Sequence, residues 1–237
     1  MAVESKTAIV KLSKSAIAGI VRETIDEIAT HRRLCVPGAR AVRKRLSAKV
    51  RSVRGEDVVA IGLAIADSRT MKASRARWVG WELINKHQGA LETLNVAAVE
   101  ALGAGNSSWD EVDGYGINIA GAAWLRGRIR DADVRRWAKD ADLWRRRAAL
   151  VATVVLNLKS HSGRGDTKRT LGIAALLIDD REDMVVKAMS WALRCLVSWD
   201  REAVENFLAQ HDEPLAARVK RETRTKLRTG VKNPKTR

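Results

Sequence analysis

Apolar residues recur along most of the chain at spacings of three and four, in blocks of about 10 to 18 residues separated by short Gly, Asp or Ser breaks. This spacing places the apolar side chains on one face of an α-helix. No alternation of apolar and polar residues is long enough to indicate a β-strand. The pattern therefore predicts helices over 10–33, 38–52, 56–67, 70–87, 90–103, 108–126, 131–139, 142–160, 166–179, 183–199, 201–211 and 214–229.

These helices form pairs with a period of about 30 to 40 residues, which is typical of a helical solenoid. The predicted fold class is all-α. The repeats share too little sequence to establish a solenoid by themselves, so a compact helical bundle is the alternative. We expect one domain over residues 1–230, followed by a basic, flexible tail over residues 231–237.

Net positive charge is the strongest feature of the composition. Lys and Arg number 44 against 28 Asp and Glu, which gives a formal net charge of +16. The segment from Arg32 to Arg54 is rich in basic residues and contains no acid, and a second basic cluster includes the run Arg145-Arg146-Arg147. Clustered positive charge fits a polyanion, of which nucleic acid is the commonest. The charge therefore favours a DNA-binding protein over a helical-repeat scaffold for other proteins.

Several function classes lack their sequence signals. No apolar segment approaches the ~20 residues of a membrane-spanning helix, and the N-terminal segment has no apolar signal-peptide core. Cys35 and Cys195 form no CxxC motif and are expected to be buried thiols, while the four histidines are scattered. We therefore expect a soluble, cytoplasmic protein that uses no metal and no cofactor.

A helix start near Ser108 introduces the first candidate site. Ser108 and Glu111 have the spacing of a capping box. Gly114, Gly116 and Gly121 follow, although each glycine costs about 1 kcal/mol relative to alanine in a helix interior. A helix that accepts this cost is expected to have another group close to its backbone.

Four side chains stand out from the helical pattern. Trp109 and Asp113 are four residues apart and share one helix face, where Asp113 is either a functional carboxylate or a surface carboxylate beside a core tryptophan. Arg147 lies in the apolar lane of its helix, so it needs a partner: a structural carboxylate, an active-site carboxylate or a phosphate. Trp191 lies off the apolar lane of its own helix, where it either packs on a neighbouring helix or contacts a cationic or sugar-like group.

Three motifs that contain these residues resemble, in the right order, the AlkD-like DNA alkylation repair glycosylases. Residues 109–113 (WDEVD) resemble the family's WDxxD signature. Residues 143–149 (LWRRRAA) resemble the segment whose arginine maps to Arg147, and residues 187–194 (KAMSWALR) resemble the helix whose active-site tryptophan maps to Trp191. The match extends over roughly residues 105–200, and three ordered motifs are more specific than one.

The resemblance implies a superhelical solenoid of HEAT-like antiparallel helix pairs whose concave, basic face holds duplex DNA. It implies a monofunctional DNA glycosylase that removes purines alkylated at N3 or N7 in base excision repair, without flipping the lesion into a pocket. We expect Asp113 to be ionised near its helix N-terminus, as that role requires. The site residues implied are the catalytic Asp113, the lesion- and sugar-contacting Trp109 and Trp191, and the phosphate-binding Arg146, Arg147, Lys187 and Arg194.

The N-terminal third departs from the family. Residues 34–40 (LCVPGAR) match the family's Gly-[Val/Ile]-x-x-Pro-like segment only loosely. Because the chain has one Tyr and one Phe, any aromatic DNA contact from this third has to come from Trp78 or Trp81.

The expected partner is double-stranded DNA that contains alkylated purines. We expect a monomer that is bacterial and cytoplasmic, and that associates with the nucleoid through this DNA. The alternative is a non-catalytic helical-repeat protein that binds distorted or branched DNA.

Overall fold

The structure is a computed structural model that describes residues 9–31, 34–67 and 74–232. These residues form helices and short connections and include no β-strand, which confirms the all-α prediction for the part of the chain described. Contacts divide the chain into an N-terminal unit, Met1–Ala104, and a C-terminal unit, Gly105–Arg237. The solenoid and the single domain over residues 1–230 stay predictions. Of the expected tail, Val231 and Lys232 are described, and residues 233–237 lie outside the described residues.

The N-terminal unit is organised around one central helix, α3, which packs against α1, α4, η1 and α5. Small residues allow the close approach of α3 and α4: a Cβ on Gly62 would lie 2.6 Å from Ile84 Cδ1, and a Cβ on Gly80 would lie 2.6 Å from the Gly62 carbonyl oxygen. The elements of this unit are α1 (Lys14–Ala29), α2 (Val36–Lys49), α3 (Gly55–Asp67), α4 (Ser74–Lys86), the 3₁₀ helix η1 (Leu91–Thr93) and α5 (Val96–Gly103).

Trp81 belongs to the core of this unit. Its side chain is fully buried, and the indole N–H donates to the Leu102 carbonyl oxygen at 3.0 Å. A buried and hydrogen-bonded indole has no face to offer DNA, so Trp81 is excluded as an aromatic DNA contact. Trp78 is half-buried and stays a candidate.

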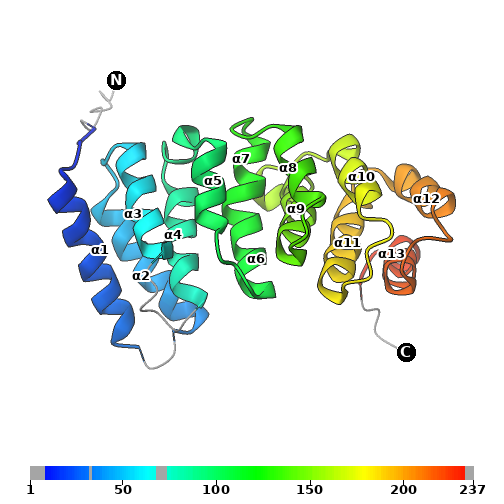
Figure 1. The fold of residues 1–237 in the computed structure, drawn as a ribbon, viewed down its shortest axis with the longest axis horizontal. Coiled ribbons are helices and arrows are strands. Elements are labelled where there is room, and N and C mark those ends of the chain that lie inside the picture. Colours follow the sequence, from blue (N-terminus) through cyan, green and yellow to red (C-terminus); the bar gives the residue numbers. More distant parts are fainter. Residues whose placement is uncertain (1–8, 32–33, 68–73, 233–237) are drawn as a thin grey trace, which may run out of the picture. The chain divides into compact units, whose positions relative to one another are not determined.

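The C-terminal unit has its helices in two layers. One layer runs through α6, α9, α11 and α13, each in contact with the next, and these helices follow one another in Figure 1. The other layer is formed by α8, α10 and α12, which pack on one another and on α9 and α11. The elements are α6 (Trp109–Tyr115), the π-helical segment η2 (Gly116–Ala120), α7 (Gly121–Leu125), α8 (Asp131–Ala138), α9 (Leu143–Leu156), the 3₁₀ helix η3 (Lys159–His161), α10 (Thr167–Leu176), α11 (Asp183–Leu196), α12 (Arg201–Gln210) and α13 (Ala217–Thr229).

The glycines after Asp113 mark the closest approach between α9 and the first helix of this unit. A Cβ on Gly116 would lie 2.6 Å from Val151 Cγ1, and a Cβ on Gly121 would lie 2.6 Å from Val155 Cγ2. The expected close approach is confirmed for Gly116 and Gly121, and the groups that approach belong to α9: the Val151 and Val155 side chains and the Ala152 carbonyl oxygen. The backbone widens into the π-helical η2 at this contact, a form that occurs often at functional sites.

The sequence predicted which segments are helical better than it predicted where a helix is interrupted or ends. The predicted helix 90–103 is interrupted, because the Asn95 side chain accepts the Ala98 N–H at 2.9 Å and starts α5 as a separate helix. The predicted helix 142–160 ends at Leu156, where Asn157 leaves the helical conformation. Part of the predicted helix 70–87, at residues 70–73, lies outside the described residues.

The cysteines differ from expectation. Cys35 is exposed at the N-cap of α2, so the prediction of a buried thiol is wrong there. Cys195 is half-buried on α11, and burial raises the pKa of its thiol to about 11. Among the residues described, none of the helices is long and apolar enough to cross a bilayer.

Candidate functional site

The centre of the candidate site is an ion pair between Asp113 on α6 and Arg147 on α9. Arg147 Nε donates to Asp113 Oδ1 at 3.0 Å, and Arg147 Nη2 donates to Asp113 Oδ2 at 2.9 Å. Arg147 Nη1 donates to the Met184 carbonyl oxygen in the first turn of α11. The Arg147 side chain is 6 % exposed and that of Asp113 is 20 % exposed. The predicted need of Arg147 for a partner is confirmed, and three helices meet at its guanidinium.

The environment makes Asp113 a stronger base than a free aspartate. Burial raises the pKa of the Asp113 carboxyl, the hydrogen bonds and charge of Arg147 oppose this rise, and the negative charge of Asp110 adds to it. Asp113 lies one turn inside α6, beyond the first turn in which a helix dipole acts strongly. The dipole therefore adds little to the charge state of this carboxyl, which burial and Arg147 influence in opposite directions, and the ionised state of Asp113 stays a prediction.

The start of α6 leaves a tryptophan open to solvent. Trp109 is the first residue of α6, and 58 % of its surface is exposed. The predicted capping box is wrong in detail, since the Ser108 hydroxyl donates to the Asp110 and Glu111 carboxylates and accepts no helix N–H. Glu111 accepts the Ser107 N–H at 3.0 Å instead. The start of α6 is thus anchored by side chains that do not cover the indole.

Trp191 lies on α11, seven residues, or about two turns, after Met184. It is half-buried, whereas its neighbours Ala192 and Leu193 are fully buried, so it lies off the core lane as predicted. A hydrogen bond from Trp191 acts on the Cys195 thiol, one turn further along α11. The second candidate tryptophan therefore belongs to the helix whose first turn contacts Arg147.

Each of the other predicted phosphate-binding cations has a carboxylate partner in the C-terminal unit. Arg146 Nε lies 2.7 Å from Asp180, and Lys187 Nζ lies 2.6 Å from Asp183. The partners of Arg194 are Ser190 and Glu222, at 3.2 and 3.6 Å. A phosphate has to compete with these anions. Lys187 offers the easiest access, because its side chain is 43 % exposed, against 17 % for Arg146 and 13 % for Arg194.

Sequence reasoning missed the acidic residues just before α11 and at its start. Asp180 holds Arg146, and Asp183 lies close enough to Arg147 that the arginine's positive charge helps to lower the pKa of Asp183, after the larger effect of Lys187. The pair Asp179-Asp180 just before a predicted helix start was a visible signal, because acids there stabilise a helix N-terminus.

A family model described as DNA alkylation repair enzyme matches residues 36–232. The chain therefore belongs to the DNA alkylation repair enzyme family. The match covers the Asp113–Arg147 pair and both candidate tryptophans, and it gives the protein a role in the repair of alkylated DNA, with DNA as its partner. A comparison with curated proteins finds none that matches the chain.

Proposed function

We propose that the protein is a monomeric, monofunctional DNA glycosylase that hydrolyses the N-glycosidic bond of cationic N3- or N7-alkylated purines in duplex DNA without flipping the base. The observation that carries this proposal is the Asp113–Arg147 pair. A half-buried carboxylate with a raised pKa, held in both oxygens by one buried arginine, lies in a chain of net charge +16 that belongs to an alkylation repair family.

The chemistry of the substrate fits a site with one carboxylate. A purine alkylated at N3 or N7 is already positively charged, so it leaves with the electron pair of the C1′–N bond as a neutral base and needs no general acid. Positive charge develops on the deoxyribose as this bond breaks, as in glycoside hydrolysis. Asp113 would stabilise that charge and accept a proton from the water that adds to C1′. Its raised pKa suits the role of base.

The tryptophans supply contacts that a cationic nucleotide favours. An indole face attracts a cation by about 0.5 to 2 kcal/mol without any hydrogen bond. Trp109 is the more accessible of the two, because it is exposed at the start of the helix that carries Asp113. Trp191 would approach from α11, on the other side of Arg147.

Binding of the DNA backbone would use the cations around this pair. A guanidinium has five N–H donors, so Arg147 can hold Asp113 and still donate to a phosphate. Lys187 and Arg194 would add charge once phosphate replaces or joins their present carboxylate partners. The sequence singles out no lysine for Schiff-base chemistry, so we expect base release without strand cleavage.

The test is release of free base from duplex DNA that carries N7-methylguanine or N3-methyladenine, followed chromatographically. Asp113→Asn should lower the rate by about 100- to 1,000-fold or more, the size expected for loss of a group that stabilises transition-state charge. DNA affinity should hold or tighten, because a charge that repels phosphate is removed. Glu82→Gln, which alters the carboxylate of an arginine pair in the N-terminal unit, is the matched control and should retain the activity.

Two results would contradict the proposal. Salt-sensitive DNA binding without base release by the native protein would identify a non-catalytic DNA-binding protein. Equal losses in Asp113→Asn and Glu82→Gln would show that the loss reflects general destabilisation and not the chemistry of Asp113.

A further inference from the structure

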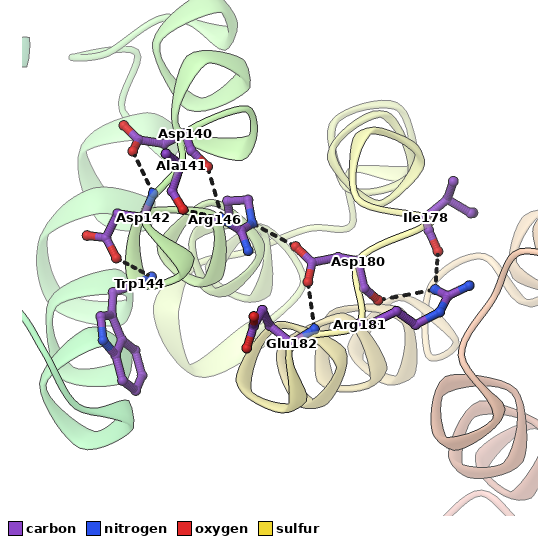
Figure 2. A network of polar contacts seen from close by, with 9 residues as sticks. All are labelled: Asp140, Ala141, Asp142, Trp144, Arg146, Ile178, Asp180, Arg181 and Glu182. Carbon is purple, nitrogen blue, oxygen red and sulfur yellow. Dashed lines mark hydrogen bonds and ion pairs between the residues drawn. The ribbon is translucent and has the colours of Figure 1, made fainter.

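Arg146 is half-buried and has a hydrogen-bond network of its own, beside Arg147 and separate from it. Its Nε donates to Asp180 Oδ2 at 2.7 Å, and its Nη1 donates to the carbonyl oxygens of Asp140 and Ala141 at 3.1 and 2.7 Å. Figure 2 shows Arg146 between the turn that precedes α9 and the turn that precedes α11, with the Trp144 indole directed away from it. These contacts occupy the guanidinium on both sides.

Asp180 connects Arg146 to the start of α11 through its two carboxylate oxygens. Its second oxygen, Oδ1, accepts the N–H of Glu182, the N-cap residue of α11, at 2.9 Å. On the far side of the same turn, Arg181 donates to the Pro214 carbonyl oxygen at 2.9 Å. Figure 2 shows the two arginines on opposite sides of Asp180. The turn before α11 is therefore held from α9 through Arg146 and from the segment before α13 through Arg181.

The first turn of α11 is also where Arg147 is held. The Met184 carbonyl oxygen, two residues after Glu182, accepts from Arg147 Nη1. Because the guanidinium is planar and rigid, its contact with Met184 fixes the plane in which Nε and Nη2 face the two oxygens of Asp113. Two consecutive arginines of α9 thus hold the start of α11: Arg146 contacts Asp180 in the preceding turn, and Arg147 contacts Met184 in the first helical turn.

We propose that Arg146 is a positioning residue: by fixing the turn before α11 through Asp180, it sets the orientation in which Arg147 holds the Asp113 carboxylate. This replaces the expected phosphate contact of Arg146. The positioning can be measured on the protein alone. Its consequence for base release rests on the function proposed above.

The test measures the pKa of Asp113 by carbon-detected NMR titration of the side-chain carboxyls, with the Asp113 signal identified by its loss in Asp113→Asn. The charged groups that act on this carboxyl are Arg147 from α9 and Asp110 from its own helix. Arg146→Gln should raise the Asp113 pKa by about 0.5 to 1 unit, because a misaligned Arg147 stabilises the carboxylate less.

Asp180→Asn separates positioning from simple charge. An asparagine replaces one carboxylate oxygen with an NH2 donor, so one of the two donors, Arg146 or the Glu182 N–H, loses its acceptor. The positioning model therefore predicts a rise in the Asp113 pKa here as well. A purely electrostatic influence predicts a fall, since a negative charge is removed. Arg146→Lys keeps the charge but cannot span Asp180 and the two turn carbonyls, so it should behave like Arg146→Gln and unlike the native protein.

Arg145→Gln is the matched control on the same helix. Arg145 is 39 % exposed and lies 3.8 Å from Asp140, so removal of its charge should leave the Asp113 pKa within about 0.2 unit. The dependence of DNA affinity on salt gives an independent readout. If Arg146 contacted a phosphate, Arg146→Gln would lower the slope against salt by about one contact; the positioning model predicts an unchanged slope.

The pKa and salt-slope measurements distinguish the positioning role of Arg146 from a phosphate contact. A lower slope with an unmoved Asp113 pKa, or a fall of that pKa in Asp180→Asn, overturns the proposal. Where the native protein releases base, the acid limb of the pH–rate profile should move upward in Arg146→Gln and Asp180→Asn by the same amount as the pKa. A native protein that releases no base would refute the proposed glycosylase and leave the pKa measurements valid.

Discussion

Each unit of the chain contains partly buried arginine–carboxylate pairs between helices, and two of these pairs, Arg43–Glu82 and Arg147–Asp113, differ in geometry. In the N-terminal unit, Arg43 on α2 contacts Glu82 on α4 through one nitrogen, at 2.9 Å. In the C-terminal unit, Arg147 on α9 holds both oxygens of Asp113 and a backbone carbonyl as well. Two parallel hydrogen bonds fix a carboxylate in orientation as well as position. Only the second geometry presents a carboxylate in one defined direction.

The tryptophans near these two pairs differ in their exposure to solvent. Trp81, adjacent to Glu82, is fully buried, its N–H is hydrogen-bonded, and Arg77 lies over its ring at 5.2 Å. Trp109, on the helix of Asp113, is largely exposed. The same residue types therefore complete a core in one unit and leave an open aromatic face in the other. An exposed indole next to a fixed, buried carboxylate is a poor use of residues for stability, which favours function at the second pair.

The largest difference is expected when each arginine is replaced by lysine. A lysine keeps the charge but cannot hold a carboxylate through two parallel bonds. Arg147→Lys should lower base release by about 100-fold, because misplacement of a catalytic group by about 1 Å has an effect of that order. Arg43→Lys should leave the rate within about twofold. Single-turnover base release on methylated duplex measures both, with thermal melts to compare stability.

Equal rate losses in Arg147→Lys and Arg43→Lys would show that the Arg147–Asp113 pair is no more important for base release than the Arg43–Glu82 pair. An unaffected Arg147→Lys enzyme would show that the orientation of Asp113 is unimportant, and it would also weaken the role inferred for Arg146.

The sequence predicts which side chains of this site need a partner or share a helix face, but it does not predict which distant residue supplies the partner. The position of Arg147 in the apolar lane of α9 was enough to predict a buried partner, because an unpaired charge cannot remain there. The shared face of Trp109 and Asp113 could also be predicted, because both residues lie on one helix at a spacing of four. The partners themselves could not be predicted, because Asp113 and Asp180 each lie 34 residues from their arginine and nothing in the local pattern connects them.

Helix boundaries show the same limit. The 3.6-residue periodicity reports which face of a segment is buried, and it located α8, α10 and α12 to within a few residues. It could not report the π-helical turn η2, because that turn forms where α9 presses on Gly116 and Gly121. The periodicity also did not predict helix capping, because Asn95 starts a new helix inside one continuous apolar pattern.

The tryptophan comparison predicts opposite balances of stability and activity. Trp81→Ala should lower the free energy of unfolding by about 3 to 5 kcal/mol, the usual cost of emptying a large core site. Trp109→Ala should change it by less than about 0.5 kcal/mol, because the side chain is mostly exposed. The same Trp109 change should slow base release about tenfold through the lost contact with a cationic base. Chemical denaturation and base-release assays on the two variants decide this.

The smallest effect expected is in the pH dependence of stability, where two aspartates should act in opposite directions. Asp57 in the N-terminal unit accepts from Arg54 Nη2 and from the Leu12 N–H, both at 2.9 Å, and the Arg54 contact is the main cause of its lowered pKa. Asp113 has a raised pKa because burial outweighs Arg147. Melting temperatures of Asp57→Asn and Asp113→Asn, measured from about pH 4 to pH 7, should diverge from the native protein by a few degrees.

The signs follow from which state binds the proton more tightly. The folded protein binds the Asp57 proton more weakly than the unfolded chain, so Asp57 stabilises above its unfolded pKa of roughly 4, and this contribution is lost as the pH falls through the lower folded pKa. Asp113 does the reverse: its contribution is full below the unfolded pKa and is lost as the pH rises through the raised folded pKa. Relative to the native protein, Asp57→Asn should therefore become less stable with rising pH, and Asp113→Asn more stable. An Asp113→Asn protein that instead loses stability relative to the native protein as the pH rises would mean that Arg147 outweighs burial, which would make the pair a structural one like Arg43–Glu82.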